Sequence, residues 1–167
     1  MIRFSQRQFL FHPVTVLVVS MVAAAVFALA VSLLFNGEFR WFLLYYFTPI
    51  GIPFVAFLFD RAEQNSLVSK TASGVDLVVL IIALIRAFIR VPLVSGHALF
   101  LVYCLLTAHS KVARIAAALV LVQVMYLKIF VTHDTALFGG VIAGCLAALM
   151  YRLVKPIKRD IQIERNI

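Results

Sequence analysis

Residues 13–35 read PVTVLVVSMVAAAVFALAVSLLF, a run of 23 residues without one charged side chain. A helix that crosses the hydrocarbon core of a bilayer needs about 20 such residues, so this run alone predicts a membrane span. Further apolar runs follow it, and hydrophobic residues make up 64% of the 167-residue chain while charged residues make up 13%. Because a soluble domain is about half apolar and about a quarter charged, this composition excludes a soluble enzyme, a disordered tail and a fibrous protein. The runs are continuous rather than alternating, which argues against a transmembrane β-barrel.

Five more apolar runs follow the first. Together they predict an all-α polytopic membrane protein, a single domain over residues 1–167 with six transmembrane helices in a bundle. The expected spans are 13–35, 41–59, 74–89, 95–108, 115–131 and 136–153. We expect a turn at Asn36–Glu38, a polar loop over 60–73 and kinks in the second span at Pro49 and Pro53. The first run is long enough to remain as a span, and no cleavable signal pattern is visible.

The net charge of +8 is best explained by membrane topology. Eleven Lys and Arg residues fall on the side of the two termini and four on the other side. Since cytoplasmic loops carry the excess of basic residues, both termini are expected in the cytoplasm, in a prokaryotic plasma membrane. No basic and aromatic segment remains outside the spans, so we expect no nucleic-acid partner. Cys104 and Cys145 lie within apolar runs and are expected to pack there.

Polar side chains gather at the outer ends of the later spans. Besides Arg40, the residues expected on that side are Arg86, Arg90, Lys128, His97, His133 and Asp134. A charge within the hydrocarbon region is costly and marks a functional site by default. His12 and His109 fall at the cytoplasmic ends of spans and are interpreted as interfacial residues.

The residue types of this outer group suit an anion that carries phosphorus. Arginine offers a planar fork for phosphate oxygens, and Ser95-Gly96 places backbone N–H groups at a helix start, where an anion is favoured. One neutral histidine can attack phosphorus while a second protonates the leaving oxygen, without a metal or other cofactor. The alternative is a zinc site built from His97, His133 and Asp134, which the three neighbouring cations would oppose.

Three stretches between Arg86 and Tyr151 resemble a known family. The stretch Ser95-Gly96-His97-Ala98-Leu99-Phe100 resembles the central motif of the type 2 phosphatidic acid phosphatase superfamily. Residues 126–134 (YLKIFVTHD), followed by Gly139, Gly140 and Gly144, resemble its third motif, and Arg86 with Arg90-Val91-Pro92 corresponds to its first. The chain departs from the family pattern in three places: Val94 replaces a proline, Lys128 falls one residue after the expected arginine, and Asp134 directly follows His133.

The resemblance implies a six-helix membrane hydrolase that acts on a phosphomonoester or diphosphate carried by a lipid. His133 would be the nucleophile, His97 the acid that protonates the leaving oxygen, and Asp134 the residue that orients His133. The phosphate would be held by Arg86, Arg90, Lys128, Ser95 and Gly96. Phosphatidic acid, phosphatidylglycerol phosphate and polyprenyl diphosphate all present such a group. Two alternatives remain, a non-catalytic relative that binds or transports a phosphorylated lipid and a helix-packing assembly subunit.

Overall fold

The computed structural model describes residues 12–64, 70–89 and 93–154, and in these ranges all regular structure is helical. The elements are α2 (Pro13–Leu34), α3 (Gly37–Tyr46), α4 (Thr48–Gln64), α5 (Lys70–Phe88), α6 (Gly96–Thr107), α7 (Lys111–Tyr126), the π-helical η1 (Leu127–Val131) and α8 (Ala136–Val154). The all-α class expected from the sequence is therefore confirmed for the described part of the chain.

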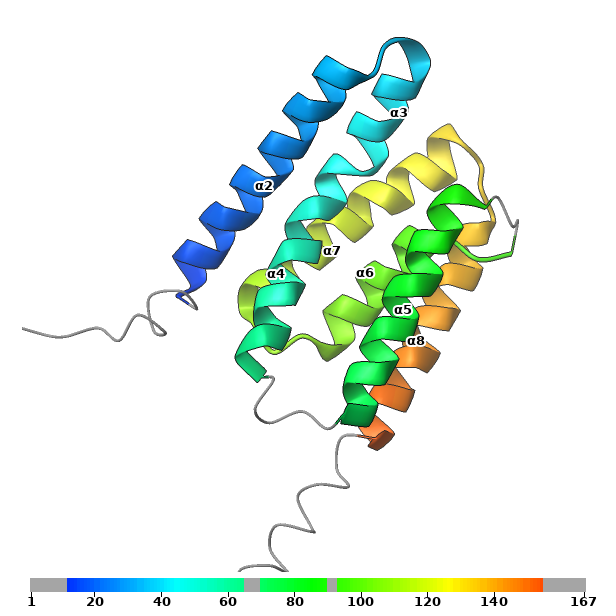
Figure 1. Cartoon of the computed structure of the whole chain (residues 1–167). Helices are drawn as coiled ribbons and strands as arrows, with labels where there is room; N and C mark the ends of the chain where they lie inside the picture. Colours follow the sequence, from blue (N-terminus) through cyan, green and yellow to red (C-terminus); the bar gives the residue numbers. More distant parts are fainter. Residues whose placement is uncertain (1–11, 65–69, 90–92, 155–167) are drawn as a thin grey trace, which may run out of the picture.

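The helices alternate in direction along one bundle (Figure 1). The ends of α2, α5 and η1 and the starts of α3, α6 and α8 lie at what we call the upper end, after its position in Figure 1. The start of α2, the end of α4, the α6–α7 turn and the end of α8 lie at the opposite, lower end. Helices α3 and α4 follow one another as a rod bent by about 40°. With α3–α4 counted as one rod and α7–η1 as another, the described chain passes along the bundle six times.

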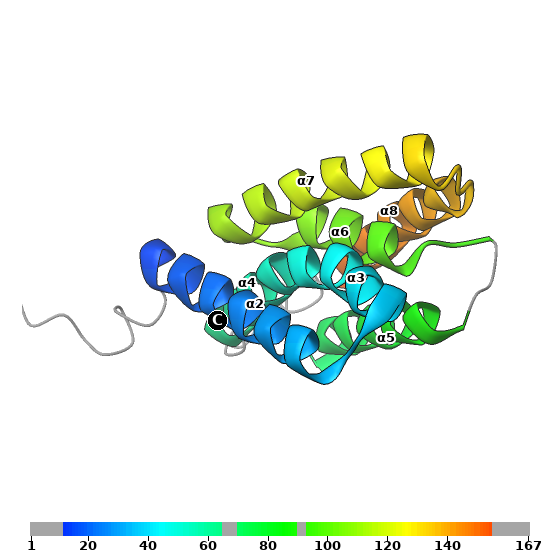
Figure 2. The same cartoon turned by 90° about the horizontal axis from the view of Figure 1, so that it is seen from above.

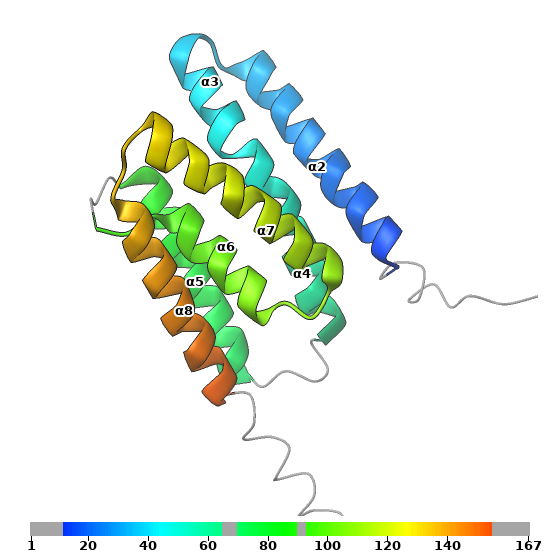
Figure 3. The same ribbon diagram turned by 180° about the vertical axis from the view of Figure 1, so that it is seen from behind.

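Helix α6 occupies the centre of the bundle, although it has only 12 residues. It packs against α5, α7 and α8 (Figure 2 and Figure 3). Leu101, Tyr103 and Cys104 within it are completely buried. A helix that is apolar on every side is one that the fold surrounds, and so the shortest of the expected spans forms the core.

Several helices have the length and composition of membrane spans. Helix α2, the α7–η1 rod and α8 are each long and apolar enough to cross a bilayer, and the α3–α4 rod adds a fourth if it counts as one span. Large apolar side chains cover their outer faces, with Leu33 75% exposed and Leu34 76% exposed. Apolar surface on this scale requires a lipid environment or a partner, so the helices are compatible with an integral membrane protein.

Some expected boundaries were wrong. Gly37, expected in a turn, begins α3 with a φ of 70°. The loop expected over 60–73 is helical at both ends, because α4 runs to Gln64 and α5 starts at Lys70. The expected proline kinks are also displaced. The bend lies between Tyr46 and Thr48, just before Pro49, while Pro53 is accommodated inside α4.

Candidate functional site

The outer group expected from the sequence lies at the upper end of the bundle. Arg86 is in the last turn of α5, Ser95 to His97 start α6, Lys128 lies in η1, and His133 and Asp134 fall in the turn before α8. These segments are distant in sequence and meet at one end of the fold (Figure 1). Arg90 lies outside the described residues.

Arg86 holds the connection between α5 and α6. Its Nε donates a hydrogen bond to the carbonyl of Val94 at 2.5 Å, and its Nη1 donates to the carbonyl of Ile89 at 2.7 Å. A guanidinium has five N–H donors, so these two bonds leave it the capacity to bind an anion as well. Arg86 therefore shapes the loop in addition to placing a positive charge at the upper end.

Ser95 and Gly96 are explained largely by the fold. The Ser95 hydroxyl caps α6 by accepting from the amide of Ala98 at 3.4 Å, and its own amide donates to the carbonyl of Ala136 at 2.8 Å. A Cβ on Gly96 would lie 2.7 Å from the carbonyl oxygen of Ala83, so only glycine lets α5 and α6 approach this closely. The Ser95 amide thus already has a partner, while its hydroxyl accepts one hydrogen bond and keeps its O–H as a donor.

His97 is half-buried in the first turn of α6. Its ring meets that of Phe47 edge to face, with centroids 5.4 Å apart. The charge of Lys128 is close enough to act electrostatically on the imidazole. The structure thus brings a histidine of α6 and a cation of η1 together.

Lys128 forms an ion pair with Asp134. The wider π-helical turn of η1 carries the lysine, and the Asp134 amide donates back to the carbonyl of Lys128 at 2.8 Å. The other carboxylate oxygen accepts from the amide of Ala136 at 2.9 Å and so caps α8. Burial raises the pKa of Asp134, but the hydrogen bonds from Lys128 and Ala136 and the charges of Lys128 and Arg86 outweigh it, so the pKa falls below 3.8.

His133 occupies the exposed turn beside this pair. Its φ is 50°, the left-handed region that residues other than glycine rarely adopt. Among the residues that the structure describes, no hydrogen bond or ion pair joins His133 to His97 or to the carboxylate of Asp134. The upper end thus unites His97, Lys128, Asp134 and Arg86, while His133 faces outward at its edge.

The zinc alternative has no ligand set in the described ranges. No three His, Cys, Asp or Glu side chains come together there in a way that could hold a metal ion. Asp134, one of the three expected ligands, is bound to Lys128 instead.

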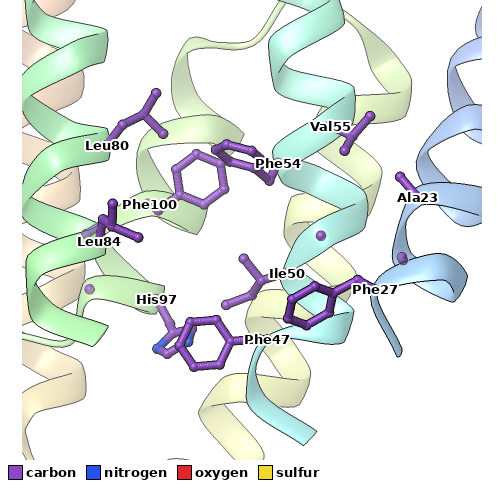
Figure 4. Close-up of a pocket in the computed structure, with 14 residues that line it drawn as sticks. Ala23, Phe27, Phe47, Ile50, Phe54, Val55, Leu80, Leu84, His97 and Phe100 are labelled. Carbon is purple, nitrogen blue, oxygen red and sulfur yellow. The ribbon is translucent and has the colours of Figure 1, made fainter. Parts of the chain in front are cut away.

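An apolar cavity of about 380 Å³ lies directly beneath this group. Its walls come from α2, the α3–α4 rod, α5 and α6, and His97 projects into its end (Figure 4). Phe47 and Phe100, which flank His97, also line the cavity. The imidazole is therefore placed between a charged surface and a hydrocarbon-lined space.

A second polar cluster, at the lower end, was not predicted from the sequence. Arg61 in α4 lies at its centre, with Nε 3.1 Å from a carboxylate oxygen of Asp76 and Nη2 donating to the hydroxyl of Thr107 at 2.9 Å. The Tyr103 hydroxyl donates to Asp76 at 2.6 Å. Asp60 accepts from the backbone amide of Ser110 at 2.6 Å, which fixes the α6–α7 turn.

This lower cluster is a structural tie. The guanidinium of Arg61 lies 4.5 Å from the ring centroids of both Phe57 and Tyr151, so one residue links α4 to α5, α6 and α8. Buried charges persist only where they are paired and hydrogen-bonded. One signal for it was present in the sequence, since Asp76 interrupts an apolar run, where an ionisable residue needs a partner.

Comparison with known proteins adds no relative, since no family model, no curated protein and no solved structure matches this chain. The candidate site is therefore defined by its own residues. These are the imidazole of His97, the cations of Arg86 and Lys128 and the carboxylate of Asp134, above an apolar cavity.

Proposed function

We propose that the protein is a membrane-embedded phosphatase that hydrolyses a phosphomonoester or diphosphate carried on a lipid. The observation that carries the proposal is the position of His97, with the charge of Lys128 acting on it from above and an apolar cavity beneath it. A phosphorylated lipid has the same arrangement, an anionic head joined to a hydrocarbon chain. A water-soluble phosphate ester has no hydrocarbon chain to place in the cavity.

In the proposed reaction, His133 attacks phosphorus and forms a nitrogen–phosphorus bond. The bond between phosphorus and the lipid oxygen breaks, and His97 passes a proton to that oxygen. Water then attacks the phosphohistidine, returns a proton to His97 and releases inorganic phosphate. Arg86, Arg90 and Lys128 stabilise the charge that develops on the phosphoryl oxygens.

The proposal places the protein in a prokaryotic plasma membrane. The chain crosses the bilayer six times, both termini are cytoplasmic, and the upper end faces outward. The excess of Lys and Arg on the terminal side supports this orientation.

The deciding experiment measures phosphate release from a panel of lipid phosphates and diphosphates, in detergent and with a chelator present. We expect release by the native chain and near-complete loss in His97→Ala and His133→Ala, since a positioned acid or base is worth about 100- to 10,000-fold. His109→Ala is the matched control, because His109 lies at the lower end. A loss under tenfold at His97 would remove it from the mechanism.

Activity that vanishes with chelator and returns with zinc would favour a metal site.

One observation favours the non-catalytic alternative, a relative that binds or transports a phosphorylated lipid. His133 is exposed, and Lys128 already has a carboxylate partner in Asp134. Saturable binding of lipid phosphate without phosphate release from any member of the panel would select this alternative.

A further inference from the structure

The apolar cavity has the dimensions of a ligand site. Binding cavities for small molecules measure about 300–1,000 Å³, and this one, at about 380 Å³, lies at the lower end of that range. Ala23 and Phe27 of α2 face Leu80 and Leu84 of α5 across it (Figure 4). Apart from His97, the side chains that line it are apolar, which suits a hydrocarbon chain.

The cavity also opens sideways. Three of its lining side chains remain substantially exposed, Leu84 at 61%, Phe27 at 42% and Phe54 at 38%, so the space between α2 and α5 reaches the outer surface of the bundle. That surface is apolar and includes α2, a helix long enough to cross a bilayer. A chain can therefore enter from the membrane without passing through water.

Only one end of the cavity carries an ionisable side chain, namely His97. Beyond His97 lie Lys128, whose charge acts on its ring, and Arg86, whose charge acts on Asp134. The polarity thus changes along the cavity from hydrocarbon to cation. An amphiphile with an anionic head and one chain is complementary to it along its whole length.

We propose that the space between α2 and α5 binds one hydrocarbon chain of the phosphorylated lipid whose head lies at His97. This chain site rests on the proposed function for the identity of the head group. It assigns a role to α2 and the α3–α4 rod, which the phosphatase motifs do not reach.

The test uses photolabelling by dodecyl phosphate that carries a diazirine at the end of its chain. In the native chain we expect the label on peptides of α4 and α5 that line the cavity. Ala23→Phe fills the space from α2 and should reduce this labelling at least about tenfold, because each excluded methylene forfeits about 0.8 kcal/mol, or about fourfold. Ala25→Phe is the matched control, since Ala25 is exposed on the same helix and does not line the cavity.

A second pair of variants guards against a folding defect. Leu84 is so exposed that tryptophan can be accommodated there, and Leu84→Trp should also reduce the labelling. Leu77→Trp, two turns earlier on α5 and outside the cavity, should not. Equal labelling in all four variants, or label on the outward faces of the helices alone, would overturn the chain site.

Phosphate release from the same probe separates the two proposals. Cavity labelling without release would refute the hydrolysis and leave the chain site standing. Release without cavity labelling would refute the chain site and leave the hydrolysis standing. A matching dodecanol probe should label the cavity less than dodecyl phosphate does, and equal labelling would contradict a head group held at His97.

Discussion

The ammonium group of Lys128 is shared between the fold and the proposed phosphate. It is paired with Asp134, and its charge also reaches His97. If Lys128 contacts phosphate, Lys128→Gln should reduce turnover about 100-fold while Lys128→Arg keeps part of it, since arginine retains the charge with a different geometry. Phosphate release at equal amounts of folded protein measures both. Near-normal turnover in Lys128→Gln would assign the lysine to the ion pair alone.

The Asp134 carboxylate should make stability depend on acid pH. Its folded pKa lies below the ordinary 3.8, so its contribution is complete above about pH 4 and is lost as the pH falls through the folded pKa. The side chain is 36% exposed, which limits the effect to about 1 kcal/mol or less. Thermal unfolding midpoints of native and Asp134→Asn protein should differ at pH 6, and the difference should shrink as the pH falls below 3.8. A gap that stays constant over this range would show that the charge contributes nothing.

His133 holds a backbone conformation that costs about 1–2 kcal/mol for a side chain other than glycine. With φ at 50°, His133→Gly should stabilise the turn or leave it unchanged, whereas His133→Ala should not stabilise it. If the histidine is the nucleophile, both variants should be inactive. Thermal unfolding reports the effect of each variant on backbone strain, and phosphate release from the same preparations reports its effect on the reaction. An active His133→Gly protein would exclude His133 as nucleophile.

At the scale of elements, glycine sets the distance between α6 and α8. A Cβ on Gly144 would lie 2.8 Å from the carbonyl oxygen of Leu99 and 2.9 Å from the Cβ of Val102. Backbone cannot move aside cheaply, so Gly144→Ala should destabilise the bundle by about 1–3 kcal/mol. Gly74→Ala on α5, where no atom lies within 4 Å, should be neutral or slightly stabilising. Unfolding midpoints in detergent provide the comparison, and equal midpoints would contradict the tight α6–α8 contact.

The sequence predicted the helices whose limits depend on apolar length alone. The run expected over 136–153 is α8 (Ala136–Val154), and the run expected over 13–35 is α2 (Pro13–Leu34). The prediction from sequence failed at residues 60–73, where the expected loop is helical at both ends. The charged side chains of this stretch give no sign that their partners lie on other helices. Arg61 is buried only because Asp76 and Thr107 from two other helices accept its hydrogen bonds.

For the site, the apolar run expected over 95–108 placed Ser95 at the start of a helix, and the structure has it as the N-cap of α6. The pairing of Lys128 with Asp134 was not foreseen, because it depends on the π-helical turn that no spacing rule indicates. The meeting of these segments at one end followed from the topology inferred from charge.

For the whole molecule, the alternating helices make a prediction about orientation. With Cys104 and Cys145 replaced, a single cysteine at Asn36 should react with a membrane-impermeant maleimide added to intact cells. Cysteines at Lys111 and Asn166 should react only after lysis, because eleven of the fifteen Lys and Arg are expected on the side of the termini. Outside labelling at Asn166 would reverse the orientation and place the proposed site in the cytoplasm.

The short central helix also has a consequence for the interior of the bundle. At about 1.5 Å per residue, the 12 residues of α6 span about 18 Å, while the hydrocarbon layer of a bilayer measures about 30 Å. The other helices cover α6, and among them α2, the α7–η1 rod and α8 are each long and apolar enough to cross a bilayer. A short helix that is buried in this way creates no mismatch with lipid. Instead, only about 18 Å of apolar helix separates the Ser95 cap at one end from the polar cluster of Arg61 and Thr107 at the other.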